Sequence, residues 1–279
     1  TGQEVTAAVV SNMTRGRSCS CLMAEKAETE VFPIDMGIAC EVEHRGELHP
    51  LTERKIRRGT SNFTKAAAMT RQEVLTAILT GIDAVRVLKE QGYRLSAVGE
   101  MGIGNTTTSS AVASVLLQKD PELVTGAGAG LDSAGLKRKT EAIRRGIGLH
   151  HPDPMDGMEV LQKVGGFDLA AMAGAFLGGA IYHVPVVIDG VIAAAAAAAA
   201  GRIAPAATDY MLAAHVSAEP ASIWLLDLIG VTPAIQAGLR LGEGTGALAL
   251  FPLLDMALSI YRDMDTFAEM EIEEYKPLV

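Results

Sequence analysis

A glutamate framed by glycines lies in the segment LRLGEGTGA, shortly before an apolar stretch that we expect to form a helix. Gly242 and Gly244 flank Glu243 and leave its carboxylate without neighbouring bulk, so the side chain can project into a pocket. Desolvation there would raise the pKa of the carboxylate towards the range of a general base. In the alternative interpretation, Glu243 is an acidic residue at the helix start that complements the helix dipole.

A second polar loop, VGEMGIGNTTTSS, follows an expected strand. Glu100 comes at the end of the strand, Gly102 and Gly104 let the backbone approach a ligand, and Asn105 and Thr106 open the next helix. Backbone N–H groups and hydroxyls at a helix N-terminus are suited to phosphate. An ordinary glycine turn with a threonine N-cap is the alternative. The loop lacks the GxxxxGKS/T pattern of nucleoside-triphosphate sites.

A third loop, TGAGAGLDSAGLKRK, places three glycines ahead of a basic helix. Gly126, Gly128 and Gly130 precede this helix, and Lys139 lies within it. Glycines followed by a lysine favour another anion site, although an ordinary glycine-rich loop fits the pattern equally well. The spacing is not GxGxxG and no clear strand precedes it, which argues against a dinucleotide site.

One aspartate, Asp189, lies at the tip of the apolar segment VPVVI. The C-terminal ends of parallel strands are where α/β proteins bind ligands, so Asp189 is either an active-site residue or the cap of the alanine-rich helix that follows. His215 fits a core or capping role better than a catalytic one. His150 and His151 beside Asp153 lack the spacing of a metal site, and we expect no metal.

The composition narrows the class of protein. Hydrophobic residues make up 49% of the 279 residues, aromatic residues only 4%, and there are 29 glycines, which suits close packing of helices on a sheet. A net charge of −9 excludes a global basic field for nucleic acid. The three cysteines form neither a disulfide framework nor a zinc site, so we expect reduced thiols and a cytoplasmic protein. Polar interruptions in the most apolar region argue against a membrane span.

The elements that must position these residues alternate along the chain. Strands are expected at 31–38, 93–99 and 184–188, and helices at 5–23, 70–91, 106–118, 136–146, 157–164, 169–181, 190–201, 207–215 and 247–264. The alternation predicts an α/β fold with a parallel sheet and helices on both faces. Eight consecutive alanines, 193–200, require one of the helices to pack tightly.

Several segments together resemble the nicotinate-nucleotide:dimethylbenzimidazole phosphoribosyltransferase family. The motifs GEMGIGNTT, TGAGAGLDSAGLKRK, GGFDLAAMAGAFLGGA, PVVIDG, HVSAEP and LRLGEGTGA follow one another in the family's order. The earlier segments EVTAAVVSNMTRG and IRRGTSNFTKAAAMT also resemble it, so that the resemblance runs from about Glu4 to Phe267. LGEGTGA together with GEMGIGNTT is highly specific.

The resemblance implies a Rossmann-like parallel sheet with a small helical domain, assembled as a homodimer. The implied reaction, in cobalamin nucleotide-loop assembly, transfers 5-phosphoribose from nicotinate mononucleotide to a benzimidazole-type base. Glu243 would be the general base and Glu100 the second acidic residue of the pocket. No metal or redox cofactor is required, because nicotinate leaves from a pyridinium and one carboxylate can take the azole proton. The expected substrate-binding residues are Met101, Gly102, Gly104, Asn105, Thr106, Gly126, Gly128, Gly130, Lys139, Asp189 and Leu241.

We expect a single phosphoribosyltransferase unit with a large α/β domain at about 30–250 and a small helical portion from about 1–25 and 250–279. Members of the family carry an upstream segment with an Asp-His-Gly loop that lines the base pocket, and we expect that segment to be missing here. Two other hypotheses are a non-catalytic partner in a heteromeric enzyme and an NAD-type oxidoreductase. The presence of Glu100 and Glu243 argues against the first, and the missing GxGxxG against the second.

Overall fold

A three-stranded parallel sheet lies at the centre of the fold. The computed structural model describes residues 2–43, 48–128 and 130–273. In spatial order, the strands are β3 (Ser96–Ala97), β4 (Val186–Ile188) and β5 (Met211–Ala213). In their register Ala97 pairs with Val187, which in turn pairs with Leu212. All three residues of β4 are buried, as its apolar sequence predicts for a central strand.

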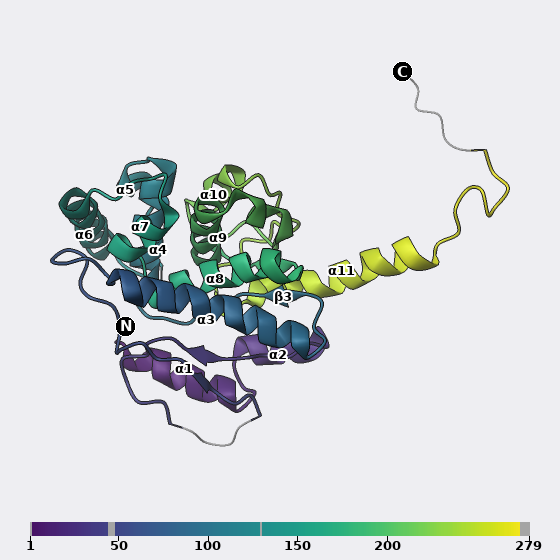
Figure 1. Cartoon of the computed structure of the whole chain (residues 1–279), viewed down its shortest axis with the longest axis horizontal. Helices are drawn as coiled ribbons and strands as arrows, with labels where there is room; N and C mark the ends of the chain where they lie inside the picture. The colour runs from purple at the N-terminus through teal and green to yellow at the C-terminus, as the bar shows by residue number, and fades with distance from the viewer. Residues whose placement is uncertain (1, 44–47, 129, 274–279) are drawn as a thin grey trace.

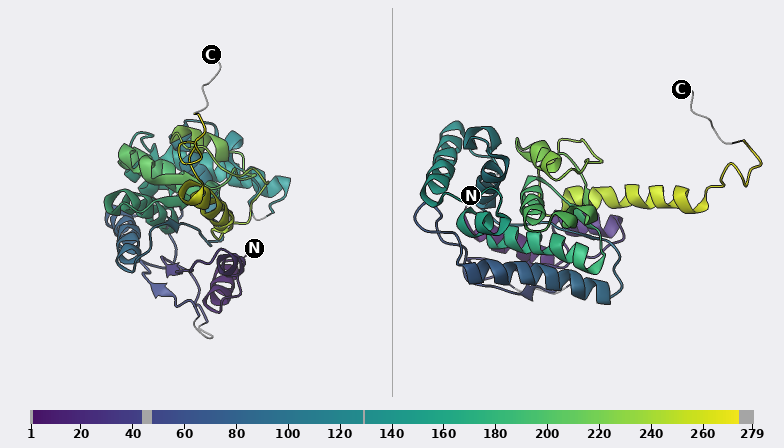
Figure 2. Two further views of the ribbon diagram at one scale, coloured as in Figure 1. Left: turned by 90° about the vertical axis from the view of Figure 1, so that its right-hand side faces the viewer. Right: turned by 45° about the horizontal axis from the view of Figure 1, so that its top comes forward.

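Helices surround this sheet and make up most of the body (Figures 1 and 2). They are α1 (Glu4–Thr14), α2 (Cys19–Lys26), α3 (Arg71–Glu90), α4 (Asn105–Leu117), α5 (Pro121–Val124), α6 (Ser133–His150), α7 (Gly157–Val164), α8 (Phe167–Tyr182), α9 (Val191–Ile203), α10 (Ser222–Leu228) and α11 (Thr245–Asp263), with a 3-10 helix, η1, at Pro205–Tyr210. α3 packs along α8, and α9 packs among α4, α7, α8 and α10.

The central strand separates two apolar cores. Val186 and Ile188 belong to the main core, to which α4, α8 and α9 contribute. Val187 lies on the opposite face, where it joins Ala247 and Leu250 of α11. Alternation of side chains along the strand therefore places helices on both faces, and the predicted α/β fold with a parallel sheet is confirmed.

Two predicted helices form for reasons that are visible in the sequence. α3 begins with a capping box, in which the Glu73 N–H donates to the Thr70 hydroxyl and the Thr70 N–H donates to the Glu73 carboxylate. In α9 the alanines at 193–200 are all buried, each at most 1% exposed. Their small side chains let the surrounding helices approach closely, as the alanine run predicts.

The N-terminal part forms a second, smaller layer beside α3 (Figure 2). It contains α1, α2 and a parallel pair of short strands, β1 (Ile34–Asp35) and β2 (Thr52–Glu53). The expected helix at 5–23 is wrong as one element, because Gly16 adopts a left-handed φ of 71° and Ser18 then caps α2. The strand expected at 31–38 shortens to two residues.

The helix expected at 207–215 is also wrong. The segment forms η1 and then strand β5, in which Met211 and Ala213 are buried while Leu212 is exposed. Pairing with β4 in the sheet overrides the local helix preference of this alanine-containing segment. The last helix, α11, is continuous from Thr245 to Asp263.

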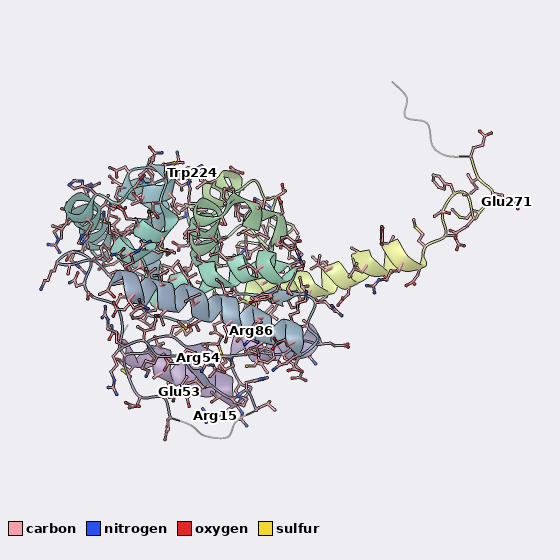
Figure 3. All side chains as sticks on the ribbon, viewed as in Figure 1. Arg15, Glu53, Arg54, Arg86, Trp224 and Glu271 are labelled. Atoms are coloured by element: carbon pink, nitrogen blue, oxygen red, sulfur yellow. The ribbon has the colours of Figure 1, made fainter. Side chains whose placement is uncertain are left out.

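The outer part of α11, residues 253–263, projects from the body (Figure 1). The chain continues beyond it to Glu271, away from the rest of the molecule (Figure 3). Large apolar side chains are exposed along this projection: Leu253, Met256, Leu258, Ile260, Tyr261, Met264 and Phe267. Within the described ranges, no helix is long and apolar enough to span a membrane.

Candidate active site

A cavity of about 780 Å³ lies between the N-terminal layer and the loop that follows β3. Residues of α1, α2, α3 and α8 contribute to its walls, together with the loop before α11. Most of the lining is apolar, but one part of it carries Glu100, Asn105, Asp168 and Glu243. The cavity therefore combines a large apolar surface with a cluster of acidic groups.

Three carboxylates meet because the elements that carry them start or end at the same place. Glu100 follows β3, Asp168 lies in the first turn of α8, and Glu243 directly precedes α11. The Asn105 side-chain amide donates to both the Glu100 carboxylate and Oδ2 of Asp168, the latter at 2.8 Å. The Glu243 N–H donates to the Glu100 carbonyl oxygen at 3.1 Å. Hydrogen bonds thus join all of these residues into one network.

Enclosure in this network changes the acidity of the carboxyl groups. Burial raises the pKa of Glu100 to about 8, the Asn105 hydrogen bond opposes the rise, and the charges of nearby carboxylates add to it. Burial likewise raises the pKa of Asp168 against the hydrogen bond from Asn105. At neutral pH Glu100 therefore favours its protonated form, which removes one negative charge from the carboxylate cluster.

The Glu243 carboxylate lies on the side of the cavity closed by α2. Its Oε2 is 3.4 Å from both the backbone N and the hydroxyl of Ser20. Gly242 lies against the Glu100 carboxylate, since a Cβ at that position would come within 2.7 Å of Oε1. The absence of a side chain at Gly242 therefore allows the Glu100 carboxylate to lie against the loop that carries Glu243.

A buried lysine lies beside the carboxylate network. The Lys139 ammonium group, on α6, donates to the Thr106 hydroxyl at 3.0 Å and to the Gly126 carbonyl oxygen at 2.9 Å. Burial lowers its pKa, while the charge of Glu219 opposes this. Because Thr106 follows Asn105 in the first turn of α4, the lysine and the acidic network lie on either side of one helix N-terminus. Such a terminus favours anions.

The structure places some of the expected site residues in the cavity and others outside it. Among the expected binding residues, those that line the cavity are Met101, Gly102, Gly104 and Asn105. Gly128 packs against Thr106, where a Cβ would approach the hydroxyl to 2.7 Å. Gly130 is exposed, and so is the Leu241 side chain, at 61%. Asp189 is buried and accepts hydrogen bonds from the start of α11, so it caps a different helix from the one considered in the sequence.

Asp168 and Ser20, which line the cavity and contact the carboxylate network, were missed in the sequence. Asp168 sits in GGFDL, an acidic residue just after two glycines at a helix start, which is the same signal that singled out Glu243. Ser20 had no signal, because its position depends on the break between α1 and α2. No group of three or more His, Cys, Asp or Glu side chains is arranged to hold a metal ion in the described part of the chain.

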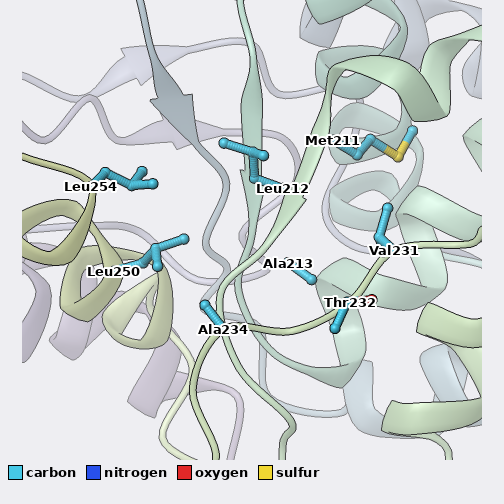
Figure 4. A pocket seen from close by; sticks show the side chains of 8 residues that line it. All are labelled: Met211, Leu212, Ala213, Val231, Thr232, Ala234, Leu250 and Leu254. Atoms are coloured by element: carbon cyan, nitrogen blue, oxygen red, sulfur yellow. The ribbon is translucent and has the colours of Figure 1, made fainter. Parts of the chain in front are cut away.

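A second hollow, of about 240 Å³, lies between β5 and α11 (Figure 4). Its lining consists of Met211, Leu212, Ala213, Val231, Thr232, Ala234, Leu250 and Leu254. These residues carry no acidic or basic group, so the hollow offers apolar contact but no acid–base chemistry. The chemistry that the sequence predicts is concentrated in the larger cavity.

Comparison with known proteins defines the class to which this fold and site belong. A family model described as phosphoribosyltransferase matches residues 1–272. Nicotinate-nucleotide–dimethylbenzimidazole phosphoribosyltransferases of Clostridium acetobutylicum and Ruminiclostridium cellulolyticum are each 44% identical to the chain, and the match covers 99% of it and 77% of each relative. The crystal structure of CobT from Thermus thermophilus matches with a TM-score of 0.92 at 39% identity, covering 99% of this chain and 81% of that one. The chain belongs to the nicotinate-nucleotide–dimethylbenzimidazole phosphoribosyltransferase family.

Proposed function

We propose that the protein transfers 5-phosphoribose from nicotinate mononucleotide to a ring nitrogen of a benzimidazole-type base. The bond between the anomeric carbon and the pyridinium nitrogen breaks, nicotinate leaves with the bonding electrons, and the azole nitrogen forms the new bond. The products are nicotinate, an α-ribotide 5′-phosphate and the proton of the azole. The observation that carries the proposal is the pair of carboxylates, Glu100 and Glu243, in the main cavity of a member of this family.

Glu243 is the general base in this proposal. The leaving pyridinium becomes a neutral ring and needs no proton, so the only proton transfer is loss of the azole N–H. The position of Glu243 on the cavity wall supports this role, because among the described residues its carboxylate oxygens have only long contacts of 3.4 Å, to Ser20. The large apolar part of the cavity suits a flat aromatic base.

Glu100 responds to the charge of the substrate. Burial and the neighbouring carboxylates raise its pKa to about 8 and so favour the protonated form. A bound pyridinium cation would lower that pKa, because an opposite charge favours the ionised carboxylate. Binding of nicotinate mononucleotide is therefore expected to release a proton. The resulting carboxylate then stabilises positive charge that develops on the ribose in the transition state.

Lys139 and the N-terminus of α4 hold the 5′-phosphate. Lys139 has three N–H donors, and its contacts with Thr106 and Gly126 direct its ammonium group towards the start of the helix. The hydroxyl of Thr106 adds a further donor there, at the positive end of the helix dipole. Gly128, Gly130 and Leu241 remain proposed substrate-binding residues, whereas the Asp189 carboxylate accepts backbone N–H groups at the start of α11.

The protein acts as a cytoplasmic homodimer in this proposal. The apolar side chains exposed on the outer part of α11 support self-association, because a projection of this kind buries little apolar surface in a single copy. The described cysteines are free thiols, in keeping with a reducing compartment. We further propose a large α/β domain at about 30–250 with a small helical part from both ends of the chain.

Mass spectrometry of reaction products tests the proposal directly. The purified chain is incubated with nicotinate mononucleotide and a panel of benzimidazoles, purines and phenols, with Glu243→Gln as the matched control. We expect nicotinate and an α-ribotide phosphate from the wild type and a strongly reduced yield from the control. Release of neither product with any base, from folded protein, would refute the proposed reaction and favour a non-catalytic homologue.

A further inference from the structure

The loop that carries Glu243 has an unusual backbone. Gly242, Glu243 and Gly244 adopt φ values of 88°, 57° and 78°, so three consecutive residues lie in the left-handed region. Glycine adopts this conformation readily, but a residue with a Cβ does so at a cost in free energy. A strained residue of this kind persists only where the surrounding structure holds it in place.

Two acceptors hold the loop by its backbone N–H groups. The Glu100 carbonyl oxygen accepts the Glu243 N–H. Asp189 at the end of β4 accepts three backbone N–H groups: Gly244 at 3.2 Å, Gly246 at 2.7 Å and Ala247 at 3.2 Å. Asp189 is only 4% exposed, so these bonds form away from water and are the stronger for it.

A histidine supports the aspartate. Nε2 of His215, which is 3% exposed, lies 3.7 Å from Oδ1 of Asp189. Its ring packs so closely on Gly246 that a Cβ there would come within 2.0 Å of it. Burial lowers the pKa of His215, but Asp189 and the backbone of Val216 raise it by more, so that its pKa lies above the usual value.

We infer that Asp189, supported by His215, is a positioning residue that fixes the backbone of Glu243 and so aims its carboxylate into the cavity. Asp189 ties the end of the central strand to the start of α11, and the loop with Glu243 lies between that tie and Glu100. This inference rests on the proposed function, in which Glu243 is the base. It gives Asp189 an effect on turnover without contact with the substrate.

The test is Asp189→Asn, which keeps the shape of the side chain but replaces one acceptor oxygen by an N–H₂ group facing backbone donors. We expect kcat to fall about 10²-fold, the usual effect of displacing a reacting group by about 1 Å, with KM for nicotinate mononucleotide nearly unchanged. In a Glu243→Gln background the same change should cause no further loss, because the group being positioned is already gone. An additive loss would show a separate role and overturn the inference.

Two further variants keep the test decisive. Asp156→Asn is the matched control, since Asp156 caps α7 by accepting the Glu159 N–H at 2.9 Å and should leave kcat unchanged. His215→Gln covers the case in which Asp189→Asn does not fold. We expect a smaller decrease in kcat from His215→Gln, and no further decrease when it is combined with Glu243→Gln. Wild-type kcat in folded Asp189→Asn or His215→Gln would overturn the inference. An inactive wild type would instead refute the proposed function and this inference with it.

Discussion

Replacing Gly99 by alanine would test how strictly the active-site loop depends on close backbone contact. A Cβ at Gly99 would lie 2.4 Å from the Gly244 nitrogen, 2.6 Å from the Glu243 carbonyl carbon and 2.7 Å from the Gly244 Cα. All three are backbone atoms, which cannot rotate away as the end of a side chain can. Because comfortable contacts between such atoms begin near about 3.5 Å, the loop must move by about 1 Å.

That displacement should reduce turnover far more than it reduces stability. A misplacement of about 1 Å at a reacting group costs about 10²-fold in rate, so we expect kcat to fall by that factor. Overpacking of this kind costs about 1–3 kcal/mol of unfolding free energy, which a domain of ordinary stability survives. KM for nicotinate mononucleotide should change little, since the proposed phosphate site at Lys139 lies on the other side of the α4 N-terminus.

The assay is steady-state release of nicotinate, with urea unfolding measured on the same samples. Gly148→Ala is the matched control: it lies within α6, nothing is found within 4 Å of its added Cβ, and alanine favours the helix. This control should keep wild-type kcat. If Gly99→Ala is folded and has the kcat of the wild type, the loop can move without a loss of activity. That result would refute the reasoning that Glu243 needs a fixed backbone.

Four further predictions concern the network and the core. Glu243→Gln should lower kcat by about 10²–10⁴-fold with nearly unchanged binding of nicotinate mononucleotide, and Glu100→Gln should lower kcat by less. If Glu100→Gln lowers kcat more than Glu243→Gln does, the two roles are exchanged. Lys139→Ala should raise KM for nicotinate mononucleotide more than it lowers kcat, whereas an unchanged KM removes Lys139 from the site. Ala196→Leu, at a fully buried position, should cost about 1–3 kcal/mol in urea unfolding, and a neutral effect would contradict its burial. The pKa of Glu100 is raised to about 8, so the contribution of this group to stability is complete at low pH and is lost as the pH rises to that value. The wild type should therefore lose more unfolding free energy between about pH 5 and pH 8 than Glu100→Gln does. Equal losses in the two proteins would contradict the raised pKa.

The features of the site that were predicted from sequence are those encoded locally. Glycines around Glu243 and the polar residues after β3 are contiguous in the chain, and a carboxylate or hydroxyl beside a helix start indicates its environment without knowledge of the fold. The apolar segment at β4 likewise identified the central strand, because full burial needs a wholly apolar sequence.

The features that were missed depend on packing between distant segments. Asp168 reaches Asn105 only because α8 starts beside α4, across 63 residues of chain. The segment before His215 favours a helix by composition, yet pairing with β4 makes Met211–Ala213 a strand. Asp189 caps α11, although the sequence suggested the adjacent helix α9. The sequence does not show that the start of α11 packs against the end of β4.

At Glu243 the residue type that the left-handed backbone favours differs from the residue type that the proposed reaction requires. Glycine or asparagine would occupy this conformation with less strain, so the amino acid that best suits the loop is not one that can accept a proton. A library screened for heat resistance alone would therefore favour substitutions at this position that abolish catalysis. Retention of glutamate here marks a position where activity and robustness conflict, and engineering for thermostability should leave this residue unchanged.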